Sequence, residues 1–337
     1  MLFYKNVLSL MKSLLSLPHW IPLLIVMTMV PEGLLAQEND VRYGIVNVSV
    51  CNTRSEAEYS AGQESQALMG MPVEILDRHH EWTRIRTPEG YEHWTLSAAV
   101  QRVDRERLTA WNQSEQVVVT RLTTWVYARP SLRAQVVSDA VGGCRMKDLG
   151  RRKGFFWVEY PDGRQGFIPR RDAQLLSKWR QEVGRDAESI LATAHSLMGI
   201  PYMWGGTSPK GVDCSGFVRT VLYMHDIILP RNASQQARVG ERLQIAPDYG
   251  NLLPGDLLFF GSRNPDGSAR RVVHVGISMG GTRFIHSLGC VHTASFNPAD
   301  ADYDEYEQNR LLFAARILPY VNQDPQIHTT DRIPLYQ

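Results

Sequence analysis

The chain carries two different patterns of hydrophobic and polar residues, which meet near residue 180. Between residues 40 and 178, short β-branched and apolar runs such as YGIVNVSV, MPVEIL, VVVTRL and FFWVEY are separated by Gly, Pro and Asp. Short strands at this spacing predict small all-β barrels. From residue 186 onward, apolar residues first recur at helical spacing and then alternate. This pattern predicts helices followed by an antiparallel sheet, as in an α+β domain.

Two segments of the β-rich region resemble each other. WTRIRTPEGYEHW begins at Trp82 and WVEYPDGRQGF begins at Trp157, an offset of 75 residues. Each has a Trp-containing strand, a turn with Pro, an acidic residue and Gly, and a second strand with an aromatic residue. We therefore expect two copies of one small domain, at about 40–104 and 115–178, that resemble bacterial SH3 domains.

The α+β domain is expected to span 186–320, after the charged segment KWRQEVGRD. Asp186 is positioned to cap its first helix, and a second helix is predicted to begin near Cys214. The inward-facing residues of the first helix are expected to be Ile190, Leu191, Ala194, Leu197 and Met198.

The first 36 residues differ in composition from the rest. Lys5 and Lys12 precede an uncharged run at 13–30, which predicts an export signal at 1–36, cleaved after Ala36, and a location in the periplasm or cell envelope. An uncleaved membrane anchor is the alternative. Cleavage removes two lysines and one glutamate, so the formal net charge of +1 becomes 0. A neutral chain gives no electrostatic reason to expect nucleic acid as a partner, and no membrane span remains.

The four cysteines are widely spaced and follow no metal-ligand pattern, so a zinc site is not expected. No metal or organic cofactor is implied. A disulfide between Cys51 and Cys144 remains an alternative for an exported chain. The chain has 43% hydrophobic and 21% charged residues, which is typical of globular proteins, and a monomer is expected.

Cys214 stands in GVDCSGFV, at the predicted start of a helix, where unpaired N–H groups favour a thiolate. His274 lies mid-strand in RRVVHVGIS, and His286 follows in FIHS on the next strand of a hairpin that turns at MGGT. Both imidazoles can therefore lie on one face. A cysteine nucleophile needs a base and a group that orients the base. The alternative is a pair of core histidines, and His292 competes with His286.

The residues around Cys214 resemble the NlpC family of papain-like cell-wall cysteine peptidases. Four segments occur in that family's order, over about 135 residues: PYMWGGTSPKGVDCSGFV, LPRNASQQ, LLPGDLLFFG and HVGISMGGTRFIHS. The resemblance implies that Cys214 is the nucleophile, that His274 is the general base and acid, and that His286 orients His274. It also implies that Tyr202 lies beside Cys214 and helps to bind the oxyanion.

The paired barrels narrow the resemblance to the dipeptidyl-peptidase VI subgroup. Its members cleave murein stem peptides between γ-D-glutamate and the following L-diamino acid, and they accept peptides with a free N-terminal L-Ala. The implied product is L-Ala-γ-D-Glu. The alternatives are a non-catalytic peptidoglycan-binding protein, and an amidase or acyltransferase on the same scaffold. The diamino acid is left open between diaminopimelate and lysine.

The same resemblance implies a set of substrate contacts. Glu64 and Tyr91, in the first barrel, are expected to contact the substrate amine. Asp213 and Ser215 are expected to flank the substrate backbone, with Asp213 as a further candidate for the amine. Trp204 is expected either to form a wall of the cleft or to belong to the core.

One position departs from the subgroup. Asn232, in LPRNASQQ, stands where relatives that bind the free amine usually have Asp. An amide oxygen can accept a hydrogen bond but lacks the charge attraction. More of the amine binding is therefore expected to rest on Asp213 and Glu64.

Overall fold

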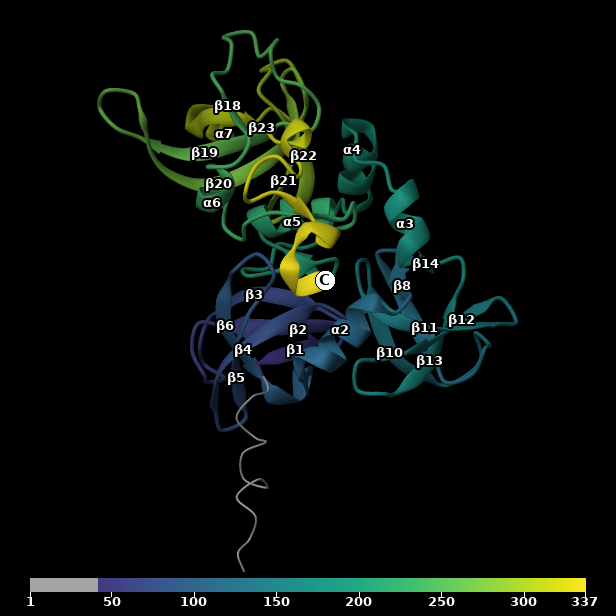
Figure 1. The fold of residues 1–337 in the computed structure, drawn as a ribbon. Coiled ribbons are helices and arrows are strands. Elements are labelled where there is room, and N and C mark those ends of the chain that lie inside the picture. The colour runs from purple at the N-terminus through teal and green to yellow at the C-terminus, as the bar shows by residue number, and fades with distance from the viewer. Residues whose placement is uncertain (1–41) are drawn as a thin grey trace, which may run out of the picture. The chain divides into compact units, whose positions relative to one another are not determined.

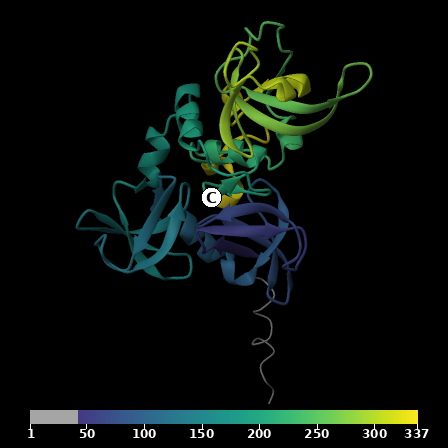
Figure 2. The same cartoon turned by 180° about the vertical axis from the view of Figure 1, so that it is seen from behind.

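The computed structural model describes residues 42–337, so the predicted export signal lies outside the described residues. Two β-rich domains precede an α+β domain (Figures 1 and 2), which confirms the predicted fold class. Within residues 42–337, no helix is long and apolar enough to cross a membrane.

The first β-rich domain, residues 43–103, is a seven-stranded sheet with the strand order β3-β2-β6-β5-β4-β1-β7. We call it the first barrel, and the second β-rich domain, residues 116–175, the second barrel. Alternate residues of the strands of the first barrel point inward, and Val46, Val73 and Ile85 are buried in its core. A short 3-10 turn at Ser97–Ala99 precedes the last strand. The strands are β1 (Tyr43–Val46), β2 (Val50–Arg54), β3 (Gln63–Leu68), β4 (Pro72–His79), β5 (Trp82–Arg86), β6 (Glu92–Leu96) and β7 (Val100–Val103).

The second β-rich domain has the order β10-β9-β13-β12-β11-β8-β14, which repeats the first strand for strand. Its core contains Val117, Val126 and Ile168. The strands are β8 (Gln116–Val119), β9 (Thr123–Tyr127), β10 (Val136–Val141), β11 (Arg145–Arg152), β12 (Phe155–Glu159), β13 (Gln165–Pro169) and β14 (Ala173–Leu175).

The matching turns of the two sheets correct the predicted offset. The N–H of Thr87 donates to the carbonyl of Tyr91, and the N–H of Tyr160 donates to the carbonyl of Arg164 in the same place. From 87 to 160 the offset is 73 residues, so the predicted value of 75 was wrong. Trp157 corresponds to position 84 and not to Trp82, and the turn residues fix the register.

Two helices connect the domains and a third begins the α+β domain. α2 (Arg105–Gln113) follows the first sheet, α3 (Leu176–Glu182) follows the second, and α4 (Ala187–Ser196) packs into the core of the α+β domain. Asp186 caps α4 as predicted, since its carboxylate accepts the N–H of Ser189 at 2.9 Å. Met198 does not face the core as predicted: it is 44% exposed, because α4 ends before it.

The α+β domain is built on a six-stranded sheet with the order β18-β23-β19-β20-β21-β22. α5, the helix predicted near Cys214, packs its apolar residues Phe217 and Val221 against Phe259 and Val275 of the sheet. The elements are β15 (Thr207–Ser208), β16 (Gly211–Val212), α5 (Cys214–Tyr223), β17 (Ile227–Ile228), α6 (Ala233–Gln236), β18 (Glu241–Leu243), β19 (Leu257–Arg263), β20 (Ala269–Gly280), β21 (Arg283–Leu288), β22 (Cys290–Ser295), α7 (Glu305–Arg310) and β23 (Leu311–Arg316).

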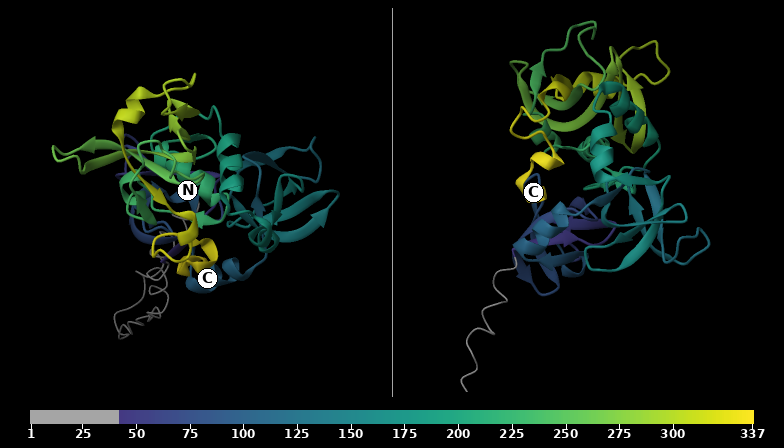
Figure 3. Two further views of the ribbon diagram at one scale, coloured as in Figure 1. Left: turned by 90° about the horizontal axis from the view of Figure 1, so that it is seen from above. Right: turned by 45° about the vertical axis from the view of Figure 1, so that its right-hand side comes forward.

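The C-terminal segment 321–337, which was predicted to lie outside the domains, packs against the α+β domain and against the first β-rich domain with its helix α2. β24 (His328–Thr329) pairs with β17, and the C-terminus lies beside the first barrel (Figures 1 and 3), where Asn112 of α2 donates to the carbonyl of Leu335. Three 3-10 turns belong to the region after β23: Leu318–Tyr320, Thr330–Arg332 and Pro334–Tyr336.

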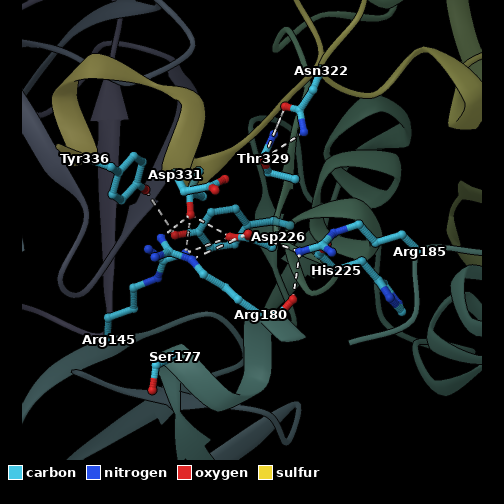
Figure 4. Close-up of polar contacts among 12 residues, drawn as sticks. Arg145, Ser177, Arg180, Arg185, His225, Asp226, Asn322, Thr329, Asp331 and Tyr336 are labelled. Atoms are coloured by element: carbon cyan, nitrogen blue, oxygen red, sulfur yellow. Dashed lines mark hydrogen bonds and ion pairs between the residues drawn. The ribbon is translucent and has the colours of Figure 1, made fainter. Parts of the chain in front are cut away.

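A buried carboxylate joins this segment to the second barrel (Figure 4). Asp226, just after α5, accepts from Arg145 of β11 at 3.3 Å, from Arg185 at 3.3 Å and from the hydroxyl of Thr330. Arg180 lies 3.6 Å from the same carboxylate. Asp226 and Arg145 are both buried, so the second barrel, α3 and the C-terminal segment meet at one charged cluster.

The predicted alternative of a disulfide between Cys51 and Cys144 is wrong, because both are free and buried. The thiol of Cys51 lies 2.9 Å from the hydroxyl of Thr95, and that of Cys144 donates to the carbonyl of Ser49 at 3.3 Å. Each cysteine is therefore a small core residue with a local hydrogen bond.

Candidate active site

Cys214 is the first residue of α5 and lies at the wall of a cleft of about 470 Å³. Asp213 caps the helix, because its carboxylate accepts the N–H of Gly216 at 2.7 Å. Burial raises the pKa of the Cys214 thiol to about 11, and the charge of Asp213 acts in the same direction. Hydrogen bonds from the N–H groups of Val275 and Ser215 partly oppose this rise by favouring the thiolate.

Two glycines of the quoted motifs hold the start of α5 in place. A Cβ at Gly216 would lie 1.8 Å from the carbonyl oxygen of Gly206, so α5 can approach this loop only where it has no side chain. Gly205 has a φ of +74°, and a Cβ there would lie 2.8 Å from the carbonyl oxygen of Gln63 in the first barrel. The WGG motif, through Gly206, and the DCSG motif, through Gly216, are therefore in direct backbone contact.

The structure brings His274 and His286 together as predicted. Nε2 of His274 lies 2.8 Å from Nδ1 of His286, and both side chains are buried. His286 pairs directly with Gly276, whose missing side chain lets the two imidazoles meet diagonally across the hairpin. Burial lowers the pKa of His274 to about 4 and that of His286 to about 2, so both are neutral at neutral pH.

The base and the thiol are positioned by neighbouring elements. α5 packs against β20, and the N–H beside the Cys214 thiol belongs to Val275, the residue that follows His274. Nε2 of His274 is engaged with His286, which leaves Nδ1 for proton exchange. A neutral thiol can pass its proton to a neutral imidazole within hydrogen-bond reach as the sulfur attacks a carbonyl carbon.

His292 lies behind His286 and does not replace it. Nε2 of His286 lies 3.0 Å from Nε2 of His292, and Nδ1 of His292 lies 2.9 Å from the carbonyl oxygen of Cys290. The three imidazoles and the carbonyl form a continuous hydrogen-bonded chain that starts at His274.

Glu307, on α7, was not predicted as a site residue from the sequence. Its side chain is buried, one oxygen accepts from Arg310 at 2.9 Å, and the other has no hydrogen-bond partner among the described residues. Burial raises its pKa to about 7. One ligand atom each of Glu307, His274 and His286 lie within 4.8 Å of one another, a donor set that zinc sites use. The two imidazole nitrogens are hydrogen-bonded to each other, and we assign no metal to them.

Arg231, also missed, changes the expected role of Asp213. Its guanidinium donates to both carboxylate oxygens of Asp213 and, at 2.9 Å, to the hydroxyl of Ser215. Asp213 also accepts the N–H of Gly205 at 3.0 Å. Because this charge is paired and its lone pairs are occupied, Asp213 and Ser215 shape the cleft wall, and Asp213 offers no free charge to an amine. Arg231 stands in LPRNASQQ, the motif that follows the one with Asp213, and a cation and an acidic residue in neighbouring motifs were the available signal.

Tyr202 and Trp204 both line the cleft. Burial raises the pKa of Tyr202 to about 12, and the proximity of Cys214 and Asp213 contributes to this rise. Its hydroxyl therefore stays protonated and able to donate. Trp204 is 68% exposed, so it belongs to the wall, and the core alternative was wrong.

The first barrel supplies part of the cleft. Glu64 of β3 lines it, and within residues 42–337 its carboxylate has no hydrogen bond or ion pair. The neighbouring Gln66 accepts the N–H of Thr207 at 2.9 Å and fixes β3 to the loop before Cys214. Asn232 also lines the cleft, and its amide donates to the hydroxyl of Tyr91 at 3.0 Å.

The sequence has relatives among named peptidases. A γ-D-glutamyl-L-lysine dipeptidyl-peptidase of Bacillus cereus is 29% identical over 232 residues, which are 66% of this chain and 67% of the relative. Dipeptidyl-peptidase 6 of Lysinibacillus sphaericus is 26% identical over 274 residues, 79% of this chain and 94% of the relative. A probable endopeptidase of Haemophilus influenzae is 35% identical over 126 residues, 34% of this chain and 73% of the relative.

The fold has solved counterparts. The crystal structure of an NlpC/P60 family protein from Bacillus cereus has a TM-score of 0.70 at 22% identity and covers 82% of this chain and all of that one. An NlpC/P60 endopeptidase from Photobacterium damselae has a TM-score of 0.60 at 17% identity, covering 82% of this chain and 71% of its own. Residues 199–312 match the NlpC/P60 family itself. With the site and these relatives together, the chain belongs to the NlpC/P60 family.

Proposed function

We propose that the protein is a cysteine endopeptidase that hydrolyses the bond between γ-D-glutamate and the L-diamino acid of murein stem peptides with a free N-terminal L-Ala. The observation that carries this proposal is the cleft, which has Cys214 at its wall and Glu64 of the first barrel at its edge. Membership of the NlpC/P60 family confirms the predicted class of cysteine peptidase. Relatives named as γ-D-glutamyl-L-lysine dipeptidyl-peptidase and dipeptidyl-peptidase 6 support the choice of bond.

In the first half of the reaction, the Cys214 thiol passes its proton to Nδ1 of His274 while the sulfur attacks the γ-carbonyl carbon of D-glutamate. The carbonyl oxygen becomes an oxyanion, which the N–H of Cys214 and the hydroxyl of Tyr202 stabilise. When the intermediate collapses, the C–N bond breaks, and His274 gives its proton to the departing amine of the diamino acid. A thioester on Cys214 remains.

In the second half, His274 removes a proton from water, and the hydroxide attacks the thioester carbon. The C–S bond breaks, the thiolate of Cys214 regains the proton from His274, and L-Ala-γ-D-Glu leaves. His286 holds the ring of His274 through the 2.8 Å hydrogen bond in both halves.

The free amine is selected by charge. With Asp213 paired to Arg231, Glu64 is the cleft carboxylate with no partner among the described residues. An ammonium group beside a partly desolvated carboxylate forms a strong charge-assisted hydrogen bond. Asn232, held by Tyr91, offers its amide oxygen as a second acceptor. We therefore assign amine recognition to Glu64 first and to Asn232 and Tyr91 second.

Murein peptides are found in the cell envelope, and we place the site of action there. The predicted export signal is consistent with this location. The substrate is the only partner that the proposal requires.

The proposal is tested with the tripeptide L-Ala-γ-D-Glu-diaminopimelate and product analysis by mass spectrometry. We expect the wild type to release L-Ala-γ-D-Glu and Cys214→Ala to release none while unfolding at the same temperature. The exposed His195→Ala serves as a control that keeps activity. Dipeptide release by Cys214→Ala would contradict the role of the thiol. Transfer of the acyl group to an added amine in preference to water would favour an acyltransferase.

A further inference from the structure

The row of hydrogen-bonded imidazoles that starts at the base, His274, continues beyond His286, which orients it, to His292. We propose that His292, anchored on the carbonyl of Cys290, is a positioning residue that fixes the tautomers of both His286 and His274. This inference rests on the proposed function for its catalytic meaning, but the tautomers themselves can be measured without any substrate.

The direction of the hydrogen bonds follows from the carbonyl at the end of the chain. A carbonyl oxygen only accepts, so Nδ1 of His292 must carry the hydrogen in the 2.9 Å contact to Cys290. A neutral imidazole has one N–H, and Nε2 of His292 is then a bare acceptor. His286 must therefore donate from its own Nε2 across the 3.0 Å contact.

The same rule carries the direction to the base. With its hydrogen on Nε2, neutral His286 has a bare Nδ1, which accepts from Nε2 of His274 at 2.8 Å. His274 then has its hydrogen on Nε2 and a bare Nδ1. That bare nitrogen is the one needed to take a proton from Cys214. The carbonyl of Cys290 therefore sets, through His292 and His286, the tautomer of His274 that can act as the base.

Without His292, nothing would determine which of His274 and His286 donates the hydrogen bond between them. His286 could then carry its hydrogen on Nδ1, donate to Nε2 of His274, and leave the hydrogen of His274 on Nδ1, where it blocks proton transfer. A doubly protonated His292 would enforce this same reversed arrangement. The other charged groups close to the dyad are Glu307 and Arg310 of α7 and Asp213 at the start of α5. None of these contacts His286 by a hydrogen bond, so none sets its tautomer in place of His292.

The direct test is nitrogen-15 NMR of the full chain with labelled histidines, assigned by single substitutions. The wild type at pH 7.5 is expected to show His274 and His286 with hydrogen on Nε2, and His292 with hydrogen on Nδ1. In His292→Phe, His286 and His274 are expected to show mixed tautomers. A pure Nε2–H form of both residues in His292→Phe would overturn the proposal, as would His286 with hydrogen on Nδ1 in the wild type.

Kinetics give a second readout. His292→Phe is expected to lower kcat about tenfold or more, with KM unchanged, since a wrong tautomer of the base costs up to about 10⁴-fold in serine peptidases. His292→Gln, whose amide oxygen can accept from His286, is expected to recover part of the loss, whereas the exposed control His195→Phe keeps full activity. Equal kcat in His292→Phe and wild type would contradict the positioning role. If no variant, including the wild type, cleaves the peptide, the proposed function fails while the NMR result still decides the tautomers.

Discussion

The two barrels have the same strand order but different relations to the active site. In the turn of the first barrel, Glu89 binds Arg219 of α5 at 2.5 Å and Tyr91 holds Asn232 at the cleft. In the matching turn of the second barrel, Asp162 binds Arg164 of the same turn. One turn therefore reaches the catalytic domain, and the other reaches the first barrel, where Arg164 also donates to the carbonyl of Asn47 at 3.0 Å.

The second barrel makes its buried ion pair at the far end of α5, and on the other side Asp139 of β10 forms a half-exposed ion pair at 2.6 Å with Lys210 of the β15–β16 hairpin. Arg145 binds Asp226 after the helix, whereas β3 of the first barrel meets the loop before Cys214. The same fold thus performs two tasks, which are to shape a cleft and to anchor the catalytic domain. The difference lies in a few turn and strand residues and not in topology, which agrees with the general rule that function resides in sites carried by folds.

The largest expected effect comes from breaking the anchor. Asp226→Asn keeps the backbone conformation, with a φ of 62° that Asn tolerates, but leaves the buried Arg145 without its counter-charge. Removing one partner of a buried ion pair costs about 3–5 kcal/mol. Urea unfolding should show a loss of that size, with kcat/KM little changed below the transition. The exposed Asp331→Asn is the matched control, and a loss under about 1 kcal/mol in Asp226→Asn would refute the anchor role.

The next effect should appear in specificity and not in stability. Glu64→Gln removes the unpaired carboxylate of the cleft and is expected to lower kcat/KM for a free-amine tripeptide by about 10- to 100-fold, since a hydrogen bond to a charged group contributes about 1.5–3 kcal/mol. For an N-acetylated peptide, kcat/KM of Glu64→Gln should differ little from that of the wild type. Glu56→Gln, an exposed residue of the same barrel, is the control. Equal losses of kcat/KM for both peptides would show that Glu64 does not bind the substrate amine.

The pH dependence of kcat should belong to the catalytic domain. Because burial lowers the pKa of His274 to about 4, the base stays neutral above that pH, and kcat should fall about tenfold per unit only below it. His286, Glu307, Arg310 and Asp213 surround this ring, whereas Glu64 lies in the first barrel. Glu64→Gln should leave the acid limb in place. An acid limb near pH 6.5 would indicate a solvated base.

The smallest effect is expected at Tyr91. Tyr91→Phe removes the hydroxyl that accepts from Asn232, which should lower kcat/KM about two- to tenfold, in line with about 0.5–1.5 kcal/mol for one hydrogen bond. Tyr127→Phe in the second barrel is the matched control and should be neutral. A larger loss in Tyr127→Phe would reverse the assignment of tasks to the two barrels.

Local patterns predicted the elements that carry the reaction. Asp186 precedes its helix as the predicted capping residue, the second helix begins at Cys214 as predicted, and strand alternation placed His274 and His286 on one face. These features depend on neighbours in sequence or on a tight hairpin. The order of the family motifs then identified Cys214 and the cleft residues Tyr202, Trp204 and Asn232.

Long-range pairing was not predictable in the same way. Arg231 neutralises Asp213 from 18 residues away, and Glu307 approaches the histidines from a separate helix. Nothing in the periodicity of either segment indicates its partner, because charge pairing is decided by packing. The C-terminal segment was missed for a similar reason, since its two-residue strand has too little pattern to detect.

The proposed enzyme is a cysteine peptidase whose first barrel selects a free amine. The most direct test compares L-Ala-γ-D-Glu-diaminopimelate with its N-acetylated form in one mass-spectrometric time course. We expect L-Ala-γ-D-Glu from the free peptide and at least about tenfold slower cleavage of the acetylated one, the rate equivalent of about 1.4 kcal/mol. Equal rates for the two peptides would contradict amine selection, and cleavage at any other bond would contradict the proposed reaction.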